Sequence, residues 1–261
     1  MSHSFAVCAY GQSPYLRECL DSVLSQDGQA SEVFIATSTP SEWLEQVARE
    51  YGVALYVNEG PGGIGPDWNF AYAQAKGRYV TIAHQDDVYC ARYATSATSQ
   101  LSARPDSLIF FCDYGELRGD KRVTRNLNLR IKRVLLAPLR SQRAAGRRGA
   151  KRAPIALGNA ICCPSVCFNK EAIPNPPFST QLGNALDWDC WERLSKQPGA
   201  FCYAPDVLMY HRIHVDSATS ANIESDVRST EDLKMLERFW PKPIAGLLFK
   251  AYAHGMDSNA M

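Results

Sequence analysis

Two adjacent carboxylates stand where a short β-prone run, residues 79–83, gives way to a loop. The loop has the sequence His84-Gln85-Asp86-Asp87. Adjacent carboxylates repel each other unless a cation or a group of donors balances them, and oxygen ligands of this kind suit Mg²⁺ or Mn²⁺ bridging a diphosphate. Capping of the next helix would explain one of the carboxylates but not both. The motif therefore predicts a divalent cation site for a diphosphate ligand.

A second acidic pair and a cationic motif lie farther along the chain. Asp187 and Asp189 open a predicted helix at residues 188–196, where an N-cap and a contact with the helix dipole are the commoner roles. The motif His211-Arg212-Ile213-His214 follows a predicted strand. It is cationic and rich in donors, which suits a departing diphosphate.

A glycine-rich loop at residues 58–69 invites a different interpretation. Gly60, Gly62 and Gly65 satisfy the G-x-G-x-x-G pattern between a strand and a helix, and Asp86 follows about twenty residues later, as in dinucleotide-binding proteins. That fingerprint belongs in the first strand-to-helix turn, whereas two complete strand-helix units precede this loop. An NAD(P)-dependent oxidoreductase that uses this loop is therefore an alternative.

The elements that must position these residues alternate between strand and helix. Alternation of this kind predicts an α/β fold with a mostly parallel, doubly wound sheet, whose ligands bind outside the carboxyl ends of the strands. The predicted strands are residues 5–9, 33–37, 54–57, 79–83, 108–112, 165–168 and 207–210, and the predicted helices are a segment from about residue 13 and residues 42–51, 66–75, 92–103 and 188–196.

Composition narrows the class of protein. The 261 residues are 46% hydrophobic and 21% charged, enough for a large core, which excludes a disordered or collagen-like chain. No apolar run approaches the roughly 20 residues that span a bilayer, and the first residues do not resemble a signal peptide, so we expect a cytoplasmic protein. The nine cysteines are an odd number without a C-x-x-C pair, which favours buried reduced thiols.

Charge is distributed unevenly. Residues 118–152 hold thirteen Lys or Arg and one acid, although the net charge of the chain is only +1. A basic nucleic-acid-binding domain is one interpretation, but no aromatic residue lies between Tyr114 and Phe168, so stacking on bases is unsupported and we expect no nucleic-acid partner. Two alternatives stay open: an amphipathic segment in peripheral contact with an anionic membrane, or a solvated, partly disordered loop.

Taken in order, these motifs resemble the family-2-type inverting glycosyltransferases of the GT-A fold, over roughly residues 5–217. The resemblance implies transfer of a sugar from a nucleoside-diphosphate sugar to a hydroxyl of a glycan or lipid-linked acceptor, in bacterial surface glycan synthesis at the inner face of the plasma membrane. It also implies a single domain with a nucleotide-binding sheet and a smaller acceptor-side part. The matching segments are residues 8–26, 58–69, 75–87, 186–194 and 210–217.

The resemblance also implies roles for individual residues. Asp187 matches the general base that takes the acceptor proton. Contacts to the donor fall on Ala9, Tyr10, Thr37, Gly63, Asn69, Gln85, Asp86 and Arg212, and the divalent cation, Mn²⁺ or Mg²⁺, falls on Asp86, Asp87 and His214.

Four positions depart from the family pattern. Thr37 stands where an aspartate usually holds the base, His84 replaces the first carboxylate of the metal motif, Leu186 replaces an acid before the catalytic aspartate, and Trp68 replaces a frequent arginine. We divide the chain into a nucleotide-sugar-binding half (1–115), a basic insertion (116–154), an acceptor and catalytic-base half (155–217) and a C-terminal helical tail (218–261).

Overall fold

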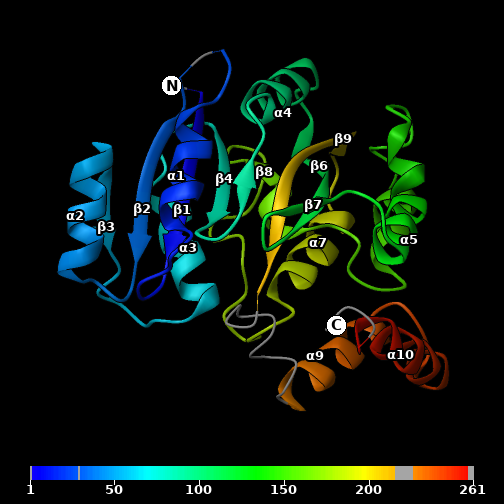
Figure 1. Ribbon diagram of the computed structural model, residues 1–261. Helices are drawn as coiled ribbons and strands as arrows, with labels where there is room; N and C mark the ends of the chain where they lie inside the picture. Colours follow the sequence, from blue (N-terminus) through cyan, green and yellow to red (C-terminus); the bar gives the residue numbers. More distant parts are fainter. Residues whose placement is uncertain (1, 29, 215–225, 258–261) are drawn as a thin grey trace.

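A computed structural model describes residues 2–28, 30–214 and 226–257 as a sheet with helices on both of its faces (Figure 1). The strands follow the order β3-β2-β1-β4-β8-β6-β9-β5, and β7 pairs with β6. They are β1 (His3–Ala9), β2 (Glu32–Thr37), β3 (Ala54–Val57), β4 (Tyr79–His84), β5 (Val88–Tyr89), β6 (Ser107–Arg118), β7 (Lys121–Val123), β8 (Val166–Asn169) and β9 (Ala200–Ile213).

Parallel pairing dominates the two parts of the sheet that frame the site. Strands β3, β2, β1 and β4 are mutually parallel, and β6 is parallel to β9. The short β8 lies between β4 and β6 and is antiparallel to both. The predicted α/β fold class is confirmed.

The helices divide between the two faces because successive strand residues point to opposite sides. In β1, Phe5 and Val7 pack with the cluster that includes α1, α2 and α4, whereas Ala6 packs with the cluster that includes α3, α7 and α9. The helices are α1 (Leu16–Leu24), α2 (Glu42–Tyr51), α3 (Ile64–Gln74), α4 (Tyr93–Ala103), α5 (Leu127–Leu136), α6 (Arg148–Arg152), α7 (Leu186–Lys196), α9 (Asp226–Glu237) and α10 (Lys242–Asp257).

Strands β6 and β9 are much longer than predicted. The sequence indicated only residues 108–112 and 207–210, but the two strands pair along their lengths, with register shifts around Asp113. Partner strands satisfy the backbone of segments whose own residues give little β signal, so tertiary pairing extended both elements. The boundary drawn at residue 115 lies inside β6.

The basic insertion is folded, which excludes one of the two alternatives, the partly disordered loop. It carries α5, α6 and short 3₁₀ turns, and Asn126 caps α5 by accepting a hydrogen bond from Leu129 N at 2.8 Å. Part of its charge is used internally. Lys151 is fully buried and its ammonium donates to the backbone oxygens of Gln197 and Gly199.

The structure also bears on the state of the cysteines and on the length of the helices. All nine cysteines are free thiols, of which six are buried, as expected, and Cys8, Cys90 and Cys162 are partly exposed. Within the described ranges, none of the helices combines the length and the apolar composition needed to cross a bilayer.

Candidate active site

The carboxyl ends of β1 and β4 meet at the point where the strand order reverses, which is where open α/β sheets bind ligands. Two hydrogen bonds join the loops there. Tyr10 N donates to Gln85 Oε1, and Gln85 Nε2 donates to Tyr10 O, both at 3.1 Å. The Tyr10 side chain remains 71% exposed, so its ring is available to a ligand. The structure thus brings together Ala9, Tyr10 and Gln85 as the sequence predicted.

The loop after β2 lies beside the β1 loop. Gly11 adopts φ +59°, a conformation that favours glycine, and its N–H donates to Thr39 Oγ1 at 2.8 Å. Thr37 is buried, and its hydroxyl accepts a hydrogen bond from Thr39 N at 3.0 Å. The Thr37 hydroxyl therefore shapes this turn.

The glycine-rich loop is organised by Asp67, which sequence reasoning missed. Its carboxylate accepts hydrogen bonds from Ser38 Oγ at 2.7 Å, Asn58 Nδ2 at 2.8 Å and Gly63 N at 3.2 Å. Gly63 has φ +124°, so a side chain there would strain the backbone. The signal in the sequence was an acid three residues into a helix that follows a glycine run.

The position of this loop argues against the dinucleotide fingerprint. It follows β3, which is the edge strand of the sheet, and not β1 at the reversal point. Gly65 lies inside α3 and approaches the backbone oxygen of Ser179, where an added Cβ would lie 3.2 Å away. Its small size therefore serves packing against residue 179, and the oxidoreductase alternative loses its main support.

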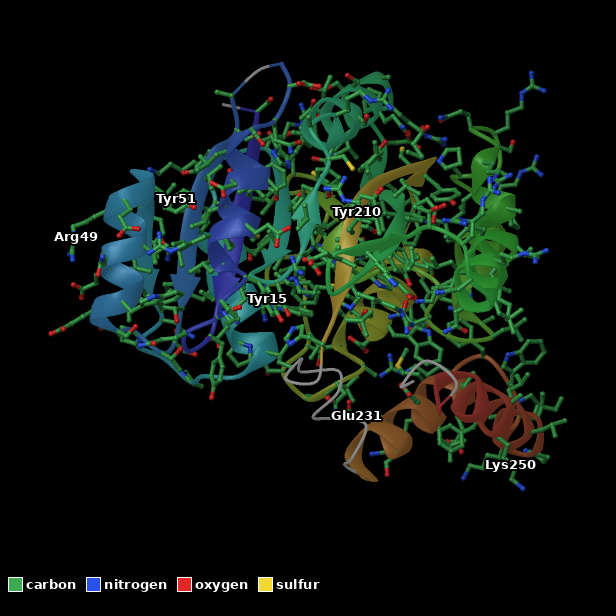
Figure 2. The ribbon with its side chains drawn as sticks, viewed as in Figure 1. Tyr15, Arg49, Tyr51, Tyr210, Glu231 and Lys250 are labelled. Atoms are coloured by element: carbon green, nitrogen blue, oxygen red, sulfur yellow. The ribbon has the colours of Figure 1, made fainter. Side chains whose placement is uncertain are left out.

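Asp86 faces His214 and Arg212 across the loops. Asp86 Oδ2 lies 2.8 Å from His214 Nε2, and Arg212 Nε donates to the backbone oxygen of Asp86 at 2.9 Å. The Arg212 guanidinium also pairs with Glu18 and lies 4.2 Å above the Tyr15 ring, which Figure 2 labels beside α1. Only 6% of the Arg212 side chain is exposed. Arg212 therefore ties α1 and β9 to the Asp86 loop.

Asp87 has the opposite environment to Asp86. It is fully buried, and its Oδ1 accepts hydrogen bonds from His211 Nδ1 and Arg212 N, each at 2.9 Å. Burial alone would raise the pKa of the Asp87 carboxyl, but His211, His84 and the Arg212 N–H lower it below its usual value. Asp87 is thus held as a carboxylate inside the fold.

The residues present fit a divalent cation in part. Asp86 and His214 offer an oxygen and a nitrogen side by side, which is a plausible pair of ligands for Mn²⁺. Asp87 Oδ1 is committed to His211 and Arg212. Across the part of the chain that the structure describes, no three His, Cys, Asp or Glu side chains are grouped as a metal site. The metal prediction therefore rests on Asp86 and His214, with other ligands to come from the donor and water.

Asp187 and Asp189 separate into two roles at the start of α7. Asp187 is half-buried, and it accepts hydrogen bonds from Asn159 Nδ2 and from Trp188 N, each at 2.7 Å. Asp189 is buried and forms ion pairs with Arg193 at 2.7 Å and Arg238 at 2.5 Å. Asp189 therefore joins α7 to the residue that follows α9, and Asp187 stays the predicted general base. Sequence reasoning missed Asn159, which gives no motif signal.

The charges of Asp87 and Asp187 both act on one thiol, that of Cys162. Burial raises the pKa of Cys162, Lys132 lowers it, and the charges of Asp87 and Asp187 both raise it further. One short segment also links the two regions by hydrogen bonds: Asn159 bonds Asp187, and Pro164 O accepts from Tyr89 Oη at 2.7 Å, two residues after Asp87.

The start of α7 is fixed by Glu231 of the C-terminal tail. Its carboxylate accepts hydrogen bonds from Gly183 N at 2.8 Å, Asn184 N at 2.8 Å and Ala185 N at 2.9 Å, and it lies on the side of α9 that faces the sheet (Figure 2). Burial alone would raise the pKa of Glu231, but these three N–H groups bring it below its usual value. A residue from the tail thus orients the turn that carries Asp187.

Asn69 and Trp68 hold the segment that leads to α7. Asn69 Nδ2 donates to Phe178 O at 2.9 Å, and Asn69 Oδ1 accepts from Phe178 N at 3.0 Å. The Trp68 ring stacks on His84, with ring centroids 4.9 Å apart. The Asn69 amide, predicted to contact the donor, is engaged with the backbone, so any effect on the donor passes through residue 178.

Comparison with protein families and curated proteins gives consistent matches. The model of the family described as Glycosyl transferase family 2 matches residues 4–157, more than half of the chain. An uncharacterized glycosyltransferase of Rickettsia prowazekii is 23% identical over 239 residues, covering 88% of this chain and 69% of that protein. Another, of Rickettsia typhi, is 22% identical over 226 residues, covering 83% and 65%. The chain spans about two thirds of the length of these relatives.

Solved structures share the fold. TarS of S. aureus, residues 1–349, has a TM-score of 0.60 at 17% identity over 92% of this chain and 70% of that chain. The mannosyltransferase PcManGT of Pyrobaculum calidifontis, in complex with GDP-Man and Mn²⁺, has a TM-score of 0.66 at 18% identity over 97% and 70%. At these identities the likeness concerns the fold alone.

Proposed function

Because the chain belongs to glycosyl transferase family 2, it is a glycosyltransferase, and we propose that it takes the sugar from a nucleoside-diphosphate sugar and inverts the anomeric carbon. The observation that carries the proposal is the separation of Asp187 from Asp189. One carboxylate at the start of α7 is tied up in ion pairs, while the other is half-buried and accepts a hydrogen bond from the Asn159 amide.

The chemistry follows from these positions. The acceptor hydroxyl oxygen attacks the anomeric carbon, Asp187 takes its proton, and the bond from that carbon to the diphosphate oxygen breaks with its electron pair going to the diphosphate. The Asn159 amide holds the Asp187 carboxylate in place through its hydrogen bond. One displacement of this kind inverts the carbon and needs no covalent intermediate.

The donor would lie across the ends of β1 and β4. Tyr10 offers an exposed ring to the nucleobase, and the backbone around Gly63 allows close approach of the ligand. A divalent cation held by Asp86 and His214 would neutralise charge on the diphosphate. TarS structures in complex with UDP-GlcNAc and with UDP, and the GDP-Man and Mn²⁺ complex of PcManGT, support a nucleotide-sugar donor and a divalent cation.

We also propose that the protein works at the cytoplasmic face of the plasma membrane on a glycan or lipid-linked acceptor of a bacterial surface glycan. Helix α5 supports this location, because Leu127, Ile131 and Val134 are exposed at helical spacing beside the exposed Arg130. Apolar residues flanked by cations are the pattern of interfacial helices. Sedimentation with anionic and neutral liposomes tests the location: binding that is absent at low salt, or unchanged in Leu127→Ser/Val134→Ser, would contradict it.

Donor protection and one variant test the proposed activity together. We expect a nucleotide sugar with Mn²⁺ to raise the melting temperature of the protein, and NAD⁺ to leave it unchanged. Asp187→Asn should keep this protection while losing at least about 100-fold in turnover, the usual scale for a general base. Asp206→Asn, at an exposed site on β9, is the matched control. Protection by NAD⁺ alone, or normal turnover of Asp187→Asn, would overturn the proposal.

A further inference from the structure

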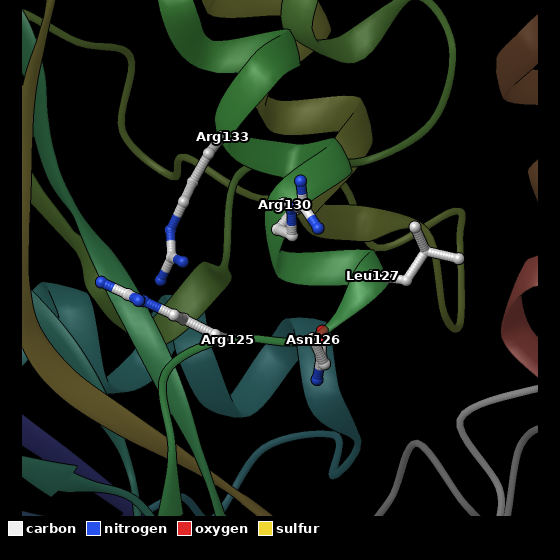
Figure 3. A pocket seen from close by; sticks show the side chains of 5 residues that line it. All are labelled: Arg125, Asn126, Leu127, Arg130 and Arg133. Atoms are coloured by element: carbon white, nitrogen blue, oxygen red, sulfur yellow. The ribbon is translucent and has the colours of Figure 1, made fainter.

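A cationic pocket lies at the start of α5, outside the loops already described. It has a volume of about 530 Å³ and is lined by Arg125, Asn126, Leu127, Arg130 and Arg133 (Figure 3). In Figure 3 the side chains of Arg125 and Arg133 extend toward one another from the two sides of the pocket. We propose that this pocket binds a phosphate group of the acceptor, an inference that rests on the proposed sugar transfer.

The charges around the pocket do not balance within the protein. Arg133 forms an ion pair with Asp113. The nearby Glu116 is paired with Arg118 at 2.9 Å and also accepts a hydrogen bond from the Asn126 amide. Both carboxylates thus already have a cationic partner of their own.

Arg125 and Arg130 are the cations left over. Both are exposed, and neither has an ion pair or a side-chain hydrogen bond with any residue that the structure describes. Two guanidinium groups with all their N–H donors unused line one space together with a third. That arrangement matches the oxygens of a phosphate, which arginine recognises through paired hydrogen bonds.

The start of α5 strengthens the positive potential. Asn126 is the N-cap of this ten-residue helix, so the positive end of the helix dipole points to the pocket that Asn126 and Leu127 line. No aromatic side chain lines the pocket, so nothing there would stack on a nucleobase. The lining therefore favours a phosphate over a nucleotide.

Lys132, which lies between Arg130 and Arg133 on α5, helps to connect the pocket with the catalytic region. Its ammonium donates to Tyr114 Oη on β6 at 2.8 Å, and the Asn126 amide of the pocket donates to Glu116 on the same strand at 2.9 Å. Glu116 lies opposite His211 of β9 in the sheet, and His211 is hydrogen-bonded to Asp87. An acceptor whose phosphate sits in the pocket would extend its hydroxyl-bearing part toward this end of β9.

Calorimetry with inorganic phosphate tests the pocket without needing turnover. We expect saturable binding at one site, at least tenfold weaker in Arg125→Ser/Arg130→Ser and changed less than twofold in Arg143→Ser/Arg148→Ser. The control removes the same charge from exposed arginines of the same insertion that lie outside the pocket. Saturating nucleoside diphosphate with Mn²⁺ should leave phosphate binding unchanged, because the donor occupies a different site.

Three results would overturn the proposal: equal weakening in both double variants, displacement of phosphate by the nucleoside diphosphate, or no saturable binding. None of them bears on donor protection or on Asp187→Asn, so failure of the pocket is distinguishable from failure of the proposed function. A second titrant, decyl phosphate below its micelle concentration, identifies the source of the phosphate. Binding at least tenfold tighter than inorganic phosphate, and lost in Leu127→Ser, indicates a lipid-linked phosphate, whereas equal binding indicates a glycan phosphate.

Discussion

Glu231 should control the turnover of the enzyme although it touches no reacting atom. Its carboxylate holds three consecutive backbone N–H groups of residues 183–185, immediately before Asp187. We expect Glu231→Ala to free this turn and displace the Asp187 carboxylate from its working position. The sites predicted for the donor, on the loops after β1 and β4, belong to other elements and should keep their geometry.

The size of the effect follows from these contacts. Hydrogen bonds to a charged group are worth about 1.5–3 kcal/mol each and do not add fully, and loss of a helix cap costs about 1 kcal/mol. Glu231 is only 7% exposed, so water would replace the carboxylate poorly. We expect Glu231→Ala to lower the free energy of unfolding by about 3 kcal/mol. Glu231→Gln, which keeps an accepting oxygen, should cost about 1 kcal/mol.

Kinetics separate a positioning role from a purely structural one. A misplacement of about 1 Å costs about 100-fold in rate, so kcat of Glu231→Ala should fall 10- to 100-fold while KM for the donor changes less than twofold. Glu231→Gln should recover most of kcat. Glu237→Gln, an exposed site on the same helix, is the control and should behave as wild type. An Ala variant that is less stable but has normal kcat would refute the reasoning.

Three further predictions concern other parts of the molecule. Asp86→Asn should abolish the gain in donor affinity that Mn²⁺ gives, measured by calorimetry with and without EDTA, while unfolding at nearly the wild-type denaturant concentration. Asp87→Asn should instead lower the free energy of unfolding by about 3 kcal/mol, because it removes one partner of a buried pair, and urea titration measures this. Burial lowers the pKa of His3 to about 3. Below about pH 6.5 the unfolded chain therefore binds a proton on His3 that the folded protein does not bind. The stability of the folded protein is consequently lost as the pH falls below about 6.5. The stability advantage of wild type over His3→Gln should therefore shrink by about 2 kcal/mol between pH 7.5 and pH 5; a constant difference would contradict this origin.

The order of elements was predictable because each has a local signal. Apolar spacing and turn residues placed the strands and helices from β1 to α4 except the two-residue β5, and the five motifs in order identified the family that the comparison confirms. The lengths of β6 and β9 were not predictable, since their extra residues gain order from each other across the sheet. The fold of the basic insertion was left open for a related reason: backbone oxygens just after α7 accept hydrogen bonds from Lys151, and Glu192 of α7 pairs with Arg152, far away in sequence.

The two acidic pairs show where prediction of the site reached its limit. The sequence marked all four carboxylates but offered no way to rank them by environment. The structure splits each pair: Asp86 faces His214 at the loop while Asp87 is buried against His211, and Asp187 bonds Asn159 while Asp189 pairs with arginines.

Geometry explains the split. Residues i and i+2 of a helix lie about 200° apart around its axis, so Asp187 and Asp189 cannot face one site, and successive side chains leaving a strand point in different directions. One member of each pair therefore binds its element to the rest of the fold, and we propose that its neighbour meets the ligand. The family resemblance selected Asp187 as the base, but the anchoring roles of Asp87 and Asp189 could not be predicted, because their partners His211 and Arg238 come from distant elements. The same division makes Asp189→Asn a test of stability rather than of chemistry. Breaking the pairs of Asp189 with Arg193 and Arg238 should lower the free energy of unfolding by about 3 kcal/mol. A variant that instead stayed stable and lost turnover would exchange the roles assigned to Asp187 and Asp189.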